Sequence, residues 1–196
     1  MMKKPVISMV LVMVLSLSTG CQGDTVNVDM SPLPVAAVPP YLCDHIPLRA
    51  VELMTGVRDP LIRGRFDLVN SKGSGEGSCL AYSRDGDKLK VLHVNLSPDG
   101  YSGEVEEQLK DGALPLPEIV PGGVGFYFKD KNSRNNAAYA MLVRGKAELT
   151  IRLEKGVEGR DSAADVLALM KLIAPKLMTD AGAPSVKAAS PSPEGS

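Results

Sequence analysis

Cysteine, histidine and clustered acidic side chains are the residues of this sequence that could supply catalytic or metal-binding chemistry. The cysteines are Cys21, Cys43 and Cys79, and the histidines are His45 and His93. No Cys, Asp or Glu accompanies His93 at the spacing of a metal site, and a histidine on a strand is usually a half-buried packing residue. The sequence therefore predicts neither a metal site nor a histidine base.

Motifs that bring together a nucleophile, an acid and a base are missing from the sequence. It holds no Gly-x-Ser-x-Gly, Ser-x-x-Lys or His-Glu-x-x-His pattern and no convincing Cys–His pair. The acids Glu104, Glu106 and Glu107 begin an expected helix, where carboxylates stabilise the positive end of the helix dipole. The glycine-rich stretch 70–78 lacks phosphate-loop spacing and is interpreted as a solvated connector. We therefore expect a protein that is not an enzyme and has no cofactor.

The start of the chain has the order of a bacterial lipoprotein signal. Lys3 and Lys4 precede an apolar run at 6–17, and small residues then lead to Cys21. The apolar run is too short to span ~30 Å of hydrocarbon, which takes ~20 residues. The pattern indicates a targeting segment that is removed on export.

The stretch 17–21, Leu-Ser-Thr-Gly-Cys, resembles a lipobox, with Ser18 where an aliphatic residue is usual. We predict that residues 1–20 are a signal peptide and that Cys21 carries lipid on the extracytoplasmic face of the cell membrane. Two alternatives stay open from the residues alone. The ordinary signal peptidase could cleave here, because Ser18 is suitably small, or the segment could be a short uncleaved anchor.

The two other cysteines are expected to pair. An odd number of cysteines in an exported chain needs an explanation, and lipid on Cys21 leaves Cys43 and Cys79 for each other. A disulfide between them would close a loop of about 37 residues, which the chain-entropy model values at roughly 4 kcal/mol. Two unrelated buried thiols are the alternative.

The charge of the expected mature chain argues against a polyanionic partner. Removing the signal takes two lysines from the 22 basic residues, so 20 basic residues stand against 23 acidic ones, a net charge of −3. Aromatic residues are scarce, with five Tyr, three Phe and no Trp, so stacking surfaces for single-stranded nucleic acid are few. We expect no nucleic-acid partner.

Composition divides the rest of the chain into a linker, a domain and a tail. Prolines among small polar residues make 21–40 an expected tether, which at ~3 Å per residue could hold the domain up to ~50 Å from its anchor. Residues 41–180 are expected to form a single domain. The stretch 181–196 is mostly Ala, Pro, Ser and Gly and is expected to be disordered.

Hydrophobic periodicity predicts three helices and five strands within the domain. The helices are expected at 44–55, 102–110 and 162–177, and the strands at 78–83, 88–96, 126–129, 137–143 and 146–154. Asp44, Ser102 and Ser162 are the expected helix caps, and Gly56 is placed to end the first helix. The sequences Asp85-Gly86 and Arg144-Gly145 indicate hairpin turns. No pattern is found at 57–77.

The last strand alternates strictly between apolar and polar residues. Leu149, Ile151 and Leu153 are predicted to face the core, with Thr150 and Arg152 on the other side. The helix at 162–177 has the best amphipathic stripe of the chain, and we expect that stripe to cover the sheet.

Several short motifs stand in the same order as in a known family. They are Cys43 followed by its helix and Gly56, Cys79 at the first strand, Gly123-Val124-Gly125 before a strand, and Val143-Arg144-Gly145 before another. The region from Leu42 to Leu177 resembles small actinobacterial envelope lipoproteins of the family called domain of unknown function three-five-five-eight. It departs from them at Ala81, where the family often has tryptophan, and at Phe126, where an acid is common.

The resemblance implies an α+β fold, a curved, mainly antiparallel sheet of about five strands with helices packed on one side. It supplies no catalytic or cofactor residue. We therefore predict a membrane-anchored, non-catalytic binding or sensory module that recognises an envelope protein or ligand. The alternative is a carrier of a small apolar ligand or lipid. An empty apolar cavity would favour the carrier, whereas a filled core and an exposed aromatic patch would favour the interaction module.

Overall fold

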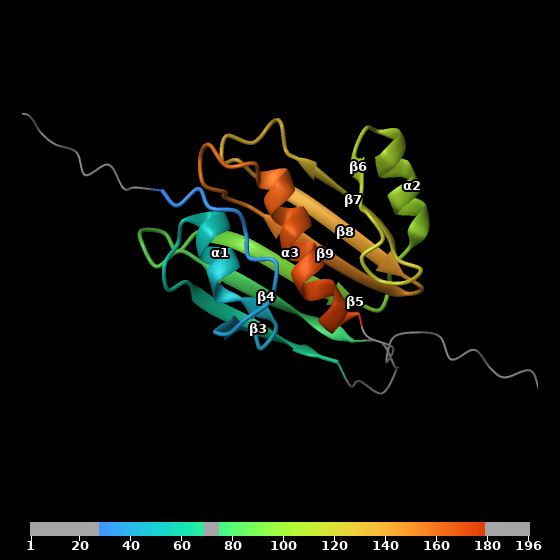
Figure 1. The fold of residues 1–196 in the computed structure, drawn as a ribbon, viewed down its shortest axis with the longest axis horizontal. Coiled ribbons are helices and arrows are strands. Elements are labelled where there is room, and N and C mark those ends of the chain that lie inside the picture. The colour runs from blue at the N-terminus through green and yellow to red at the C-terminus, as the bar shows by residue number, and fades with distance from the viewer. Residues whose placement is uncertain (1–27, 69–74, 179–196) are drawn as a thin grey trace, which may run out of the picture.

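A computed structural model describes residues 28–68 and 75–178 of the chain (Figure 1). The predicted signal peptide at 1–20, the predicted lipidation site Cys21 and the predicted tail at 181–196 lie outside the described residues.

A seven-stranded antiparallel sheet, with strand order β3-β4-β5-β9-β8-β7-β6, forms one layer of the fold (Figure 1). Its strands are β3 (Leu61–Asp67), β4 (Glu76–Tyr82), β5 (Lys90–Ser97), β6 (Leu114–Pro115), β7 (Val124–Lys129), β8 (Ala138–Arg144) and β9 (Ala147–Leu153). The short strands β1 (Tyr41–Leu42) and β2 (Ile46–Pro47) pair separately, and the helices are α1 (Leu48–Thr55), α2 (Ser102–Lys110) and α3 (Ser162–Leu177). The predicted α+β class is confirmed. The predicted sheet of about five curved strands is wrong, because the sheet has seven strands and does not curl.

Both predicted hairpins are present. Strands β4 and β5 flank the turn that contains Asp85-Gly86, and β8 and β9 flank Arg144-Gly145. Gly86 and Gly145 each have a φ of 61°, a left-handed conformation that glycine adopts without steric cost. The two turn sequences therefore predicted the correct strand pairs, β4 with β5 and β8 with β9.

Strand β3 is the main element that the sequence did not predict. It pairs with β4 along its whole length, from Leu61 to Asp67, as the edge of the sheet. Arg63, Gly64 and Arg65 are exposed in its middle, so the strand lacks the apolar alternation that marks a half-buried strand. Its position depends on pairing with β4, and that pairing leaves no signal in the strand's own sequence.

The two faces of the sheet differ in their cover. Helix α3 lies over β8 and β9, with α1 beside it over β5, and we call this side the helix face (Figure 1). Leu149, Ile151 and Leu153 of β9 are fully buried there, as predicted, whereas Arg152 is exposed on the opposite side, the open face.

Helix α2 lies on the open face, so the prediction that all helices pack on one side is wrong for α2. Its one buried residue, Val105, forms a small cluster with Phe126, Met141 and Val143. These side chains of β7 and β8 alternate with those that face α3, and they therefore point to the opposite side of the sheet. A single buried residue on a short helix does not reveal which face it covers.

The helix ends differ partly from the predicted ones. Gly56 ends α1 in a left-handed conformation, as predicted. Asp44 does not cap α1, because it has a positive φ of 66° in the turn between β1 and β2, and Pro47 stands at the cap without a side-chain bond. Asp161, not Ser162, caps α3, its carboxylate accepting hydrogen bonds from two amides of the first turn. Ser102 likewise begins α2 without being its cap residue.

The segment 28–40, which was expected to be part of a solvated tether, lies against the domain. Figure 1 shows it in blue on the helix face, beside α1 and α3. Leu33 is buried in the core, and the guanidinium of Arg160 donates hydrogen bonds to the carbonyls of Asp29 at 3.1 Å and Ser31 at 2.8 Å. The prediction of a solvated tether is wrong for this part of the chain because Arg160, more than 120 positions away, binds its backbone carbonyls.

Arg160 is itself held by a buried ion pair with Asp165. Two hydrogen bonds of 2.8 and 2.7 Å join the guanidinium to the carboxylate, and only 5% and 9% of the two side chains are exposed. The bond to Asp165 raises the pKa of Arg160 above its already high value. The Arg160 guanidinium is therefore charged, and its Nη1 donates to the two carbonyls while Nε and Nη2 donate to Asp165.

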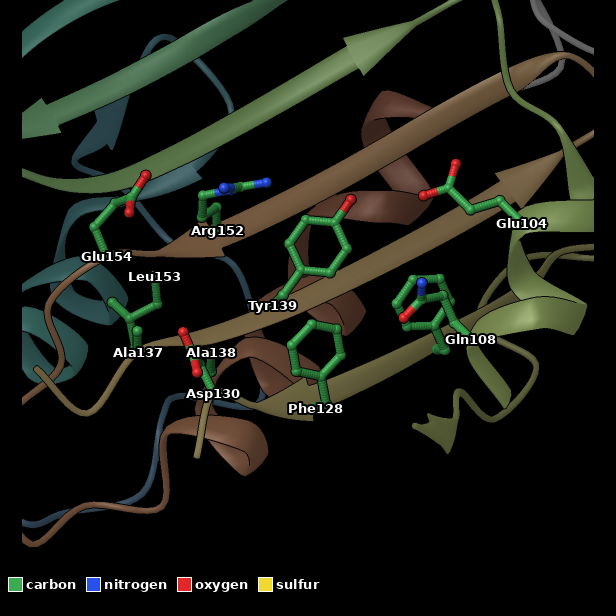
Figure 2. Close-up of a pocket in the computed structure, with 11 residues that line it drawn as sticks. Glu104, Gln108, Phe128, Asp130, Ala137, Ala138, Tyr139, Arg152, Leu153 and Glu154 are labelled. Atoms are coloured by element: carbon green, nitrogen blue, oxygen red, sulfur yellow. The ribbon is translucent and has the colours of Figure 1, made fainter. Parts of the chain in front are cut away.

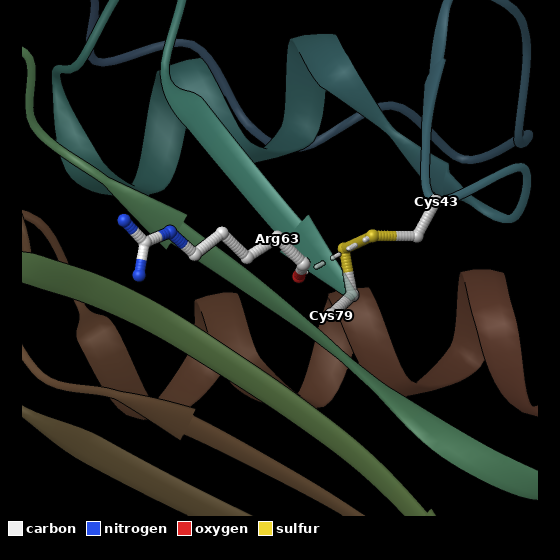
Figure 3. The surroundings of a disulfide bond; sticks show 3 residues. All are labelled: Cys43, Arg63 and Cys79. Atoms are coloured by element: carbon white, nitrogen blue, oxygen red, sulfur yellow. Dashed lines mark hydrogen bonds between the residues drawn. A yellow bond between two sulfur atoms is a disulfide. The ribbon is translucent and has the colours of Figure 1, made fainter. Parts of the chain in front are cut away.

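The predicted disulfide between Cys43 and Cys79 is present, with the two Cα atoms 6.0 Å apart. It joins the turn before α1 to β4, in the sheet (Figure 3). The Arg63 carbonyl of β3 lies 4.0 Å from Cys43 Sγ. The bond thus joins the α1 region to β4, the strand next to the edge strand β3.

The burial of Ile151 gives a first prediction. Ile151→Ala should lower the free energy of unfolding by ~2–5 kcal/mol, because it removes buried methyl groups and leaves a cavity beneath α3. Chemical denaturation checks it. The neighbouring change Arg152→Ala is the control and should cost less than ~1 kcal/mol. If Arg152→Ala proves the more damaging change, the assignment of the two faces is wrong.

The buried ion pair gives a second prediction. Arg160→Ala leaves the Asp165 carboxylate buried without its partner and should lower the free energy of unfolding by ~3–5 kcal/mol. Arg84→Ala is the matched control, because its ion pair with Asp59 is 50% and 82% exposed and should contribute less than ~1 kcal/mol. Equal losses in urea denaturation would contradict the special role of the Arg160 pair.

Candidate binding groove on the open sheet face

The residues that sequence analysis considered for chemistry lie apart in the structure. Cys43 and Cys79 are joined in the disulfide, His45 contacts the ring of Phe66 with 5.9 Å between ring centres, and His93 lies on the open face opposite Arg152 in the β5–β9 pair. Within the described ranges, no group of three or more His, Cys, Asp or Glu could hold a metal ion. None of the helices described is long and apolar enough to cross a membrane.

A groove of about 270 Å³ lies on the open face, between α2 and strands β7, β8 and β9 (Figure 2). Its lining comes from elements that are far apart in the sequence. The lining residues are Glu104, Gln108, Phe126, Phe128, Asp130, Ala137, Ala138, Tyr139, Arg152, Leu153 and Glu154.

Three aromatic rings form the floor of the groove. Phe126 and Phe128, two residues apart on β7, are stacked with ring centres 6.1 Å apart, and Tyr139 of β8 lies 5.8 and 5.6 Å from them. Phe126 is buried, whereas Phe128 and Tyr139 are half-buried. Alternate residues of a strand share a face, so the sheet itself aligns these rings. The groove thus presents an apolar surface to solvent beside α2.

Charged side chains stand along the rim of the groove. The Arg152 guanidinium of β9 lies over the Tyr139 ring, 5.4 Å from its centre, a cation–π arrangement (Figure 2). Glu104 of α2 is on the far side of Tyr139, and Glu154 at the β9 end pairs with Lys90 at 3.0 Å. One edge therefore carries a cation and the other a carboxylate, with the aromatic floor between them.

Burial and nearby acids change the ionisation of groups at this site. Burial, followed by the negative charges of Glu148 and Glu104, raises the pKa of Tyr139 to about 12, against the opposing influence of Arg152. Burial, followed by Glu104 and Asp99, also raises the pKa of Glu148. Tyr139 is therefore a neutral hydroxyl at physiological pH, able to donate or accept a hydrogen bond.

The imidazole of His93 is uncharged at neutral pH for a related reason. Its burial lowers the pKa, and the positive charges of Lys90 and Arg152 lower it further, whereas Glu154 acts in the opposite direction. His93 does not line the groove. Among the residues that do, the functional groups are aromatic rings, carboxylates, an amide and one guanidinium, which is a set suited to recognition of another molecule.

The sequence analysis did not identify this groove. Phe126 and Phe128 stand at the spacing of one strand face, and Arg152 was placed on the outer side of its strand, so parts of the signal were present. These residues become neighbours only because β9, β8 and β7 lie side by side in the sheet, although turns separate the strands along the chain.

No protein-family model matches this chain, and no curated protein sequence matches it. The resemblance to actinobacterial envelope lipoproteins therefore stays a prediction. The function has to be argued from the site.

The ionisation of Tyr139 gives a third prediction. A tyrosine in an unfolded chain titrates near pH 10, so burial of the neutral form stabilises the fold fully below pH ~10, and this contribution is lost as pH rises through about 12. Absorbance of tyrosinate should show a late titration near pH 12 that disappears in Tyr139→Phe. A native Tyr139 that ionises near pH 10, as a tyrosine in an unfolded chain does, would contradict the burial of its hydroxyl.

Proposed function

We propose that this chain is a membrane-anchored extracytoplasmic lipoprotein whose domain is a non-catalytic binding module, and that the groove on the open face holds part of a partner in the cell envelope. The observation that carries this proposal is the aromatic floor of the groove. Phe128 and Tyr139 are half-buried outside the main core, and the Arg152 guanidinium lies over the Tyr139 ring.

An exposed aromatic surface flanked by charge is the usual composition of a binding hot spot. Tyr and Arg are enriched among the residues that dominate interface energies, and partly buried aromatic rings supply apolar contact area with few rotatable bonds. A partner segment in the groove could place an apolar group on Phe128 and a polar group between Arg152 and Glu104. This favours a peptide-like partner surface over a purely apolar ligand.

The packing beneath the helices argues for the binding module over the apolar carrier. A carrier would need space between the sheet and α3, where Leu149, Ile151 and Leu153 meet Leu169 and Met170 with essentially no exposure. This interior is filled by large side chains. The groove of the open face, with its charged rim, is the better supported site.

The extracytoplasmic location rests on the predicted lipid at Cys21 and is consistent with the disulfide. Disulfides persist in oxidising compartments outside the cytoplasm. The Cys43–Cys79 bond joins two distant parts of the described fold, which is the arrangement of a structural disulfide. Both features fit a domain that works on the outer side of the cell membrane.

Site-specific photocrosslinking in cells gives the fourth prediction and tests the binding module. A benzophenone amino acid in place of Gln108, which lines the groove, should yield a discrete crosslinked product. The same group in place of Glu106, an exposed residue of α2 outside the lining, should not. Equal products from both positions, or none from position 108, would count against the groove as the binding site.

Two arginines on the open face provide a matched pair of variants for this experiment. Arg152→Ala should abolish the product while the domain stays folded, because it removes the cation from the rim of the groove. Arg63→Ala should leave the product intact, although Arg63 also lies over a tyrosine ring, that of Tyr82, at 5.5 Å. Persistence of the product in Arg152→Ala would show that the partner does not use this rim.

A further inference from the structure

We infer that the segment 28–38 and the adjoining outer side of α3 form a membrane-docking surface, which rests on an anionic phospholipid bilayer and turns the groove away from it. The inference rests on the proposed lipid anchor at Cys21. It goes beyond the anchor because it assigns a second surface of the domain to the bilayer itself. That contact sets the orientation of the groove relative to the bilayer.

The segment carries a concentration of exposed apolar side chains. Nine large hydrophobic residues are exposed in the described part of the chain, and four of them stand within eleven residues of this segment. They are Val28 at 42%, Met30 at 52%, Val35 at 101% and Val38 at 51% exposure. Single exposed apolar residues are ordinary, but a cluster of this kind marks a contact surface.

An apolar hollow on α3 continues this surface. The hollow, of about 280 Å³, begins beside Val35, the most exposed of the four. Its lining residues are Leu33, Pro34, Val35, Ala164, Leu167, Ala168, Lys171 and Leu172. Seven of the eight are apolar, so the hollow suits acyl chains or the apolar level of a lipid interface.

The charge on this side of α3 complements an anionic bilayer. Lys171, which lines the hollow, is exposed, and the helix contains no acidic residue after Asp165. Lys176 is also exposed, with its ammonium over the Tyr41 ring at 4.6 Å. Lysines at the edge of an apolar surface can bury their methylene stems while the ammonium groups stay at the level of the headgroups. The combination of apolar residues and lysines is the one that favours a lipid surface over an apolar protein partner.

The length of chain before the described segment limits where this surface can lie. Cys21 and Val28 are seven residues apart, and seven residues span at most ~25 Å. The segment is fixed beyond that point, since Arg160 holds the carbonyls of Asp29 and Ser31, and Arg49 forms an ion pair with Asp29. A lipid on Cys21 therefore keeps the helix face close to the bilayer, and the open face, on the opposite side of the sheet, points away.

Tryptophan fluorescence can test the docking because the chain contains no tryptophan. Val35→Trp places one reporter on the proposed surface, and Val124→Trp places another on the open face, at a valine that is 49% exposed. Each full-length variant is produced in cells that process lipoproteins and is reconstituted into vesicles of phosphatidylethanolamine and phosphatidylglycerol, with and without brominated acyl chains.

The expected result is a blue-shifted emission and strong quenching by brominated lipid at position 35, with neither effect at position 124. Lys171→Glu in the Val35→Trp background should reduce the quenching. Mass spectrometry of the N-terminal peptide reports separately whether Cys21 carries lipid. Lipid on Cys21 with an unquenched reporter at position 35 would overturn the docking and leave the anchor intact, whereas a Cys21 without lipid would overturn the anchor and with it this inference.

Discussion

The burial of β9 in the middle of the sheet is the constraint on which the rest of the structure depends. Its apolar side chains, Leu149, Ile151 and Leu153, are fully buried, and they fix the face against which α3 must lie. Because strand residues alternate, the same register sends Arg152 to the other side. The core and the groove are therefore two consequences of one strand register, and a slip by one residue would destroy both.

The open face has its groove because its cover is incomplete. A sheet with one solvated face normally carries polar side chains there, and most of β9 follows that rule. Strands β7 and β8 depart from it, since they place aromatic side chains outward, and α2 shields only the part around Phe126 and Val105. The rings of Phe128 and Tyr139 are left at the margin of that shield, where burial is sufficient to raise the pKa of Tyr139 but leaves the rings accessible.

Sequence reasoning identified the elements whose signals are local and missed those that depend on distant partners. The Asp-Gly turn, the alternation of the last strand and the stripe of α3 each lie within one short window, and all three were found. Edge strand β3 was missed because Arg63-Gly64-Arg65 gives no apolar period, and pairing with β4 alone makes it a strand. The groove was missed for the same reason, because Glu104, Phe128 and Arg152 become neighbours only through the strand order.

The proline-rich segment shows how one buried charge can reverse an expectation from composition. Prolines and small polar residues lack the periodicity of a packed element. The sequence of 28–40 therefore does not predict that this segment lies on the helix face. The Arg160 guanidinium, buried in its ion pair with Asp165, needs further acceptors, and the carbonyls of Asp29 and Ser31 accept from its Nη1. Releasing the segment would withdraw two acceptors from the buried guanidinium and expose Leu33, and both changes oppose the conformational entropy that a free tether would regain. The ion pair thereby shortens the free chain between the predicted lipid anchor and the domain, on the side of the sheet opposite the groove.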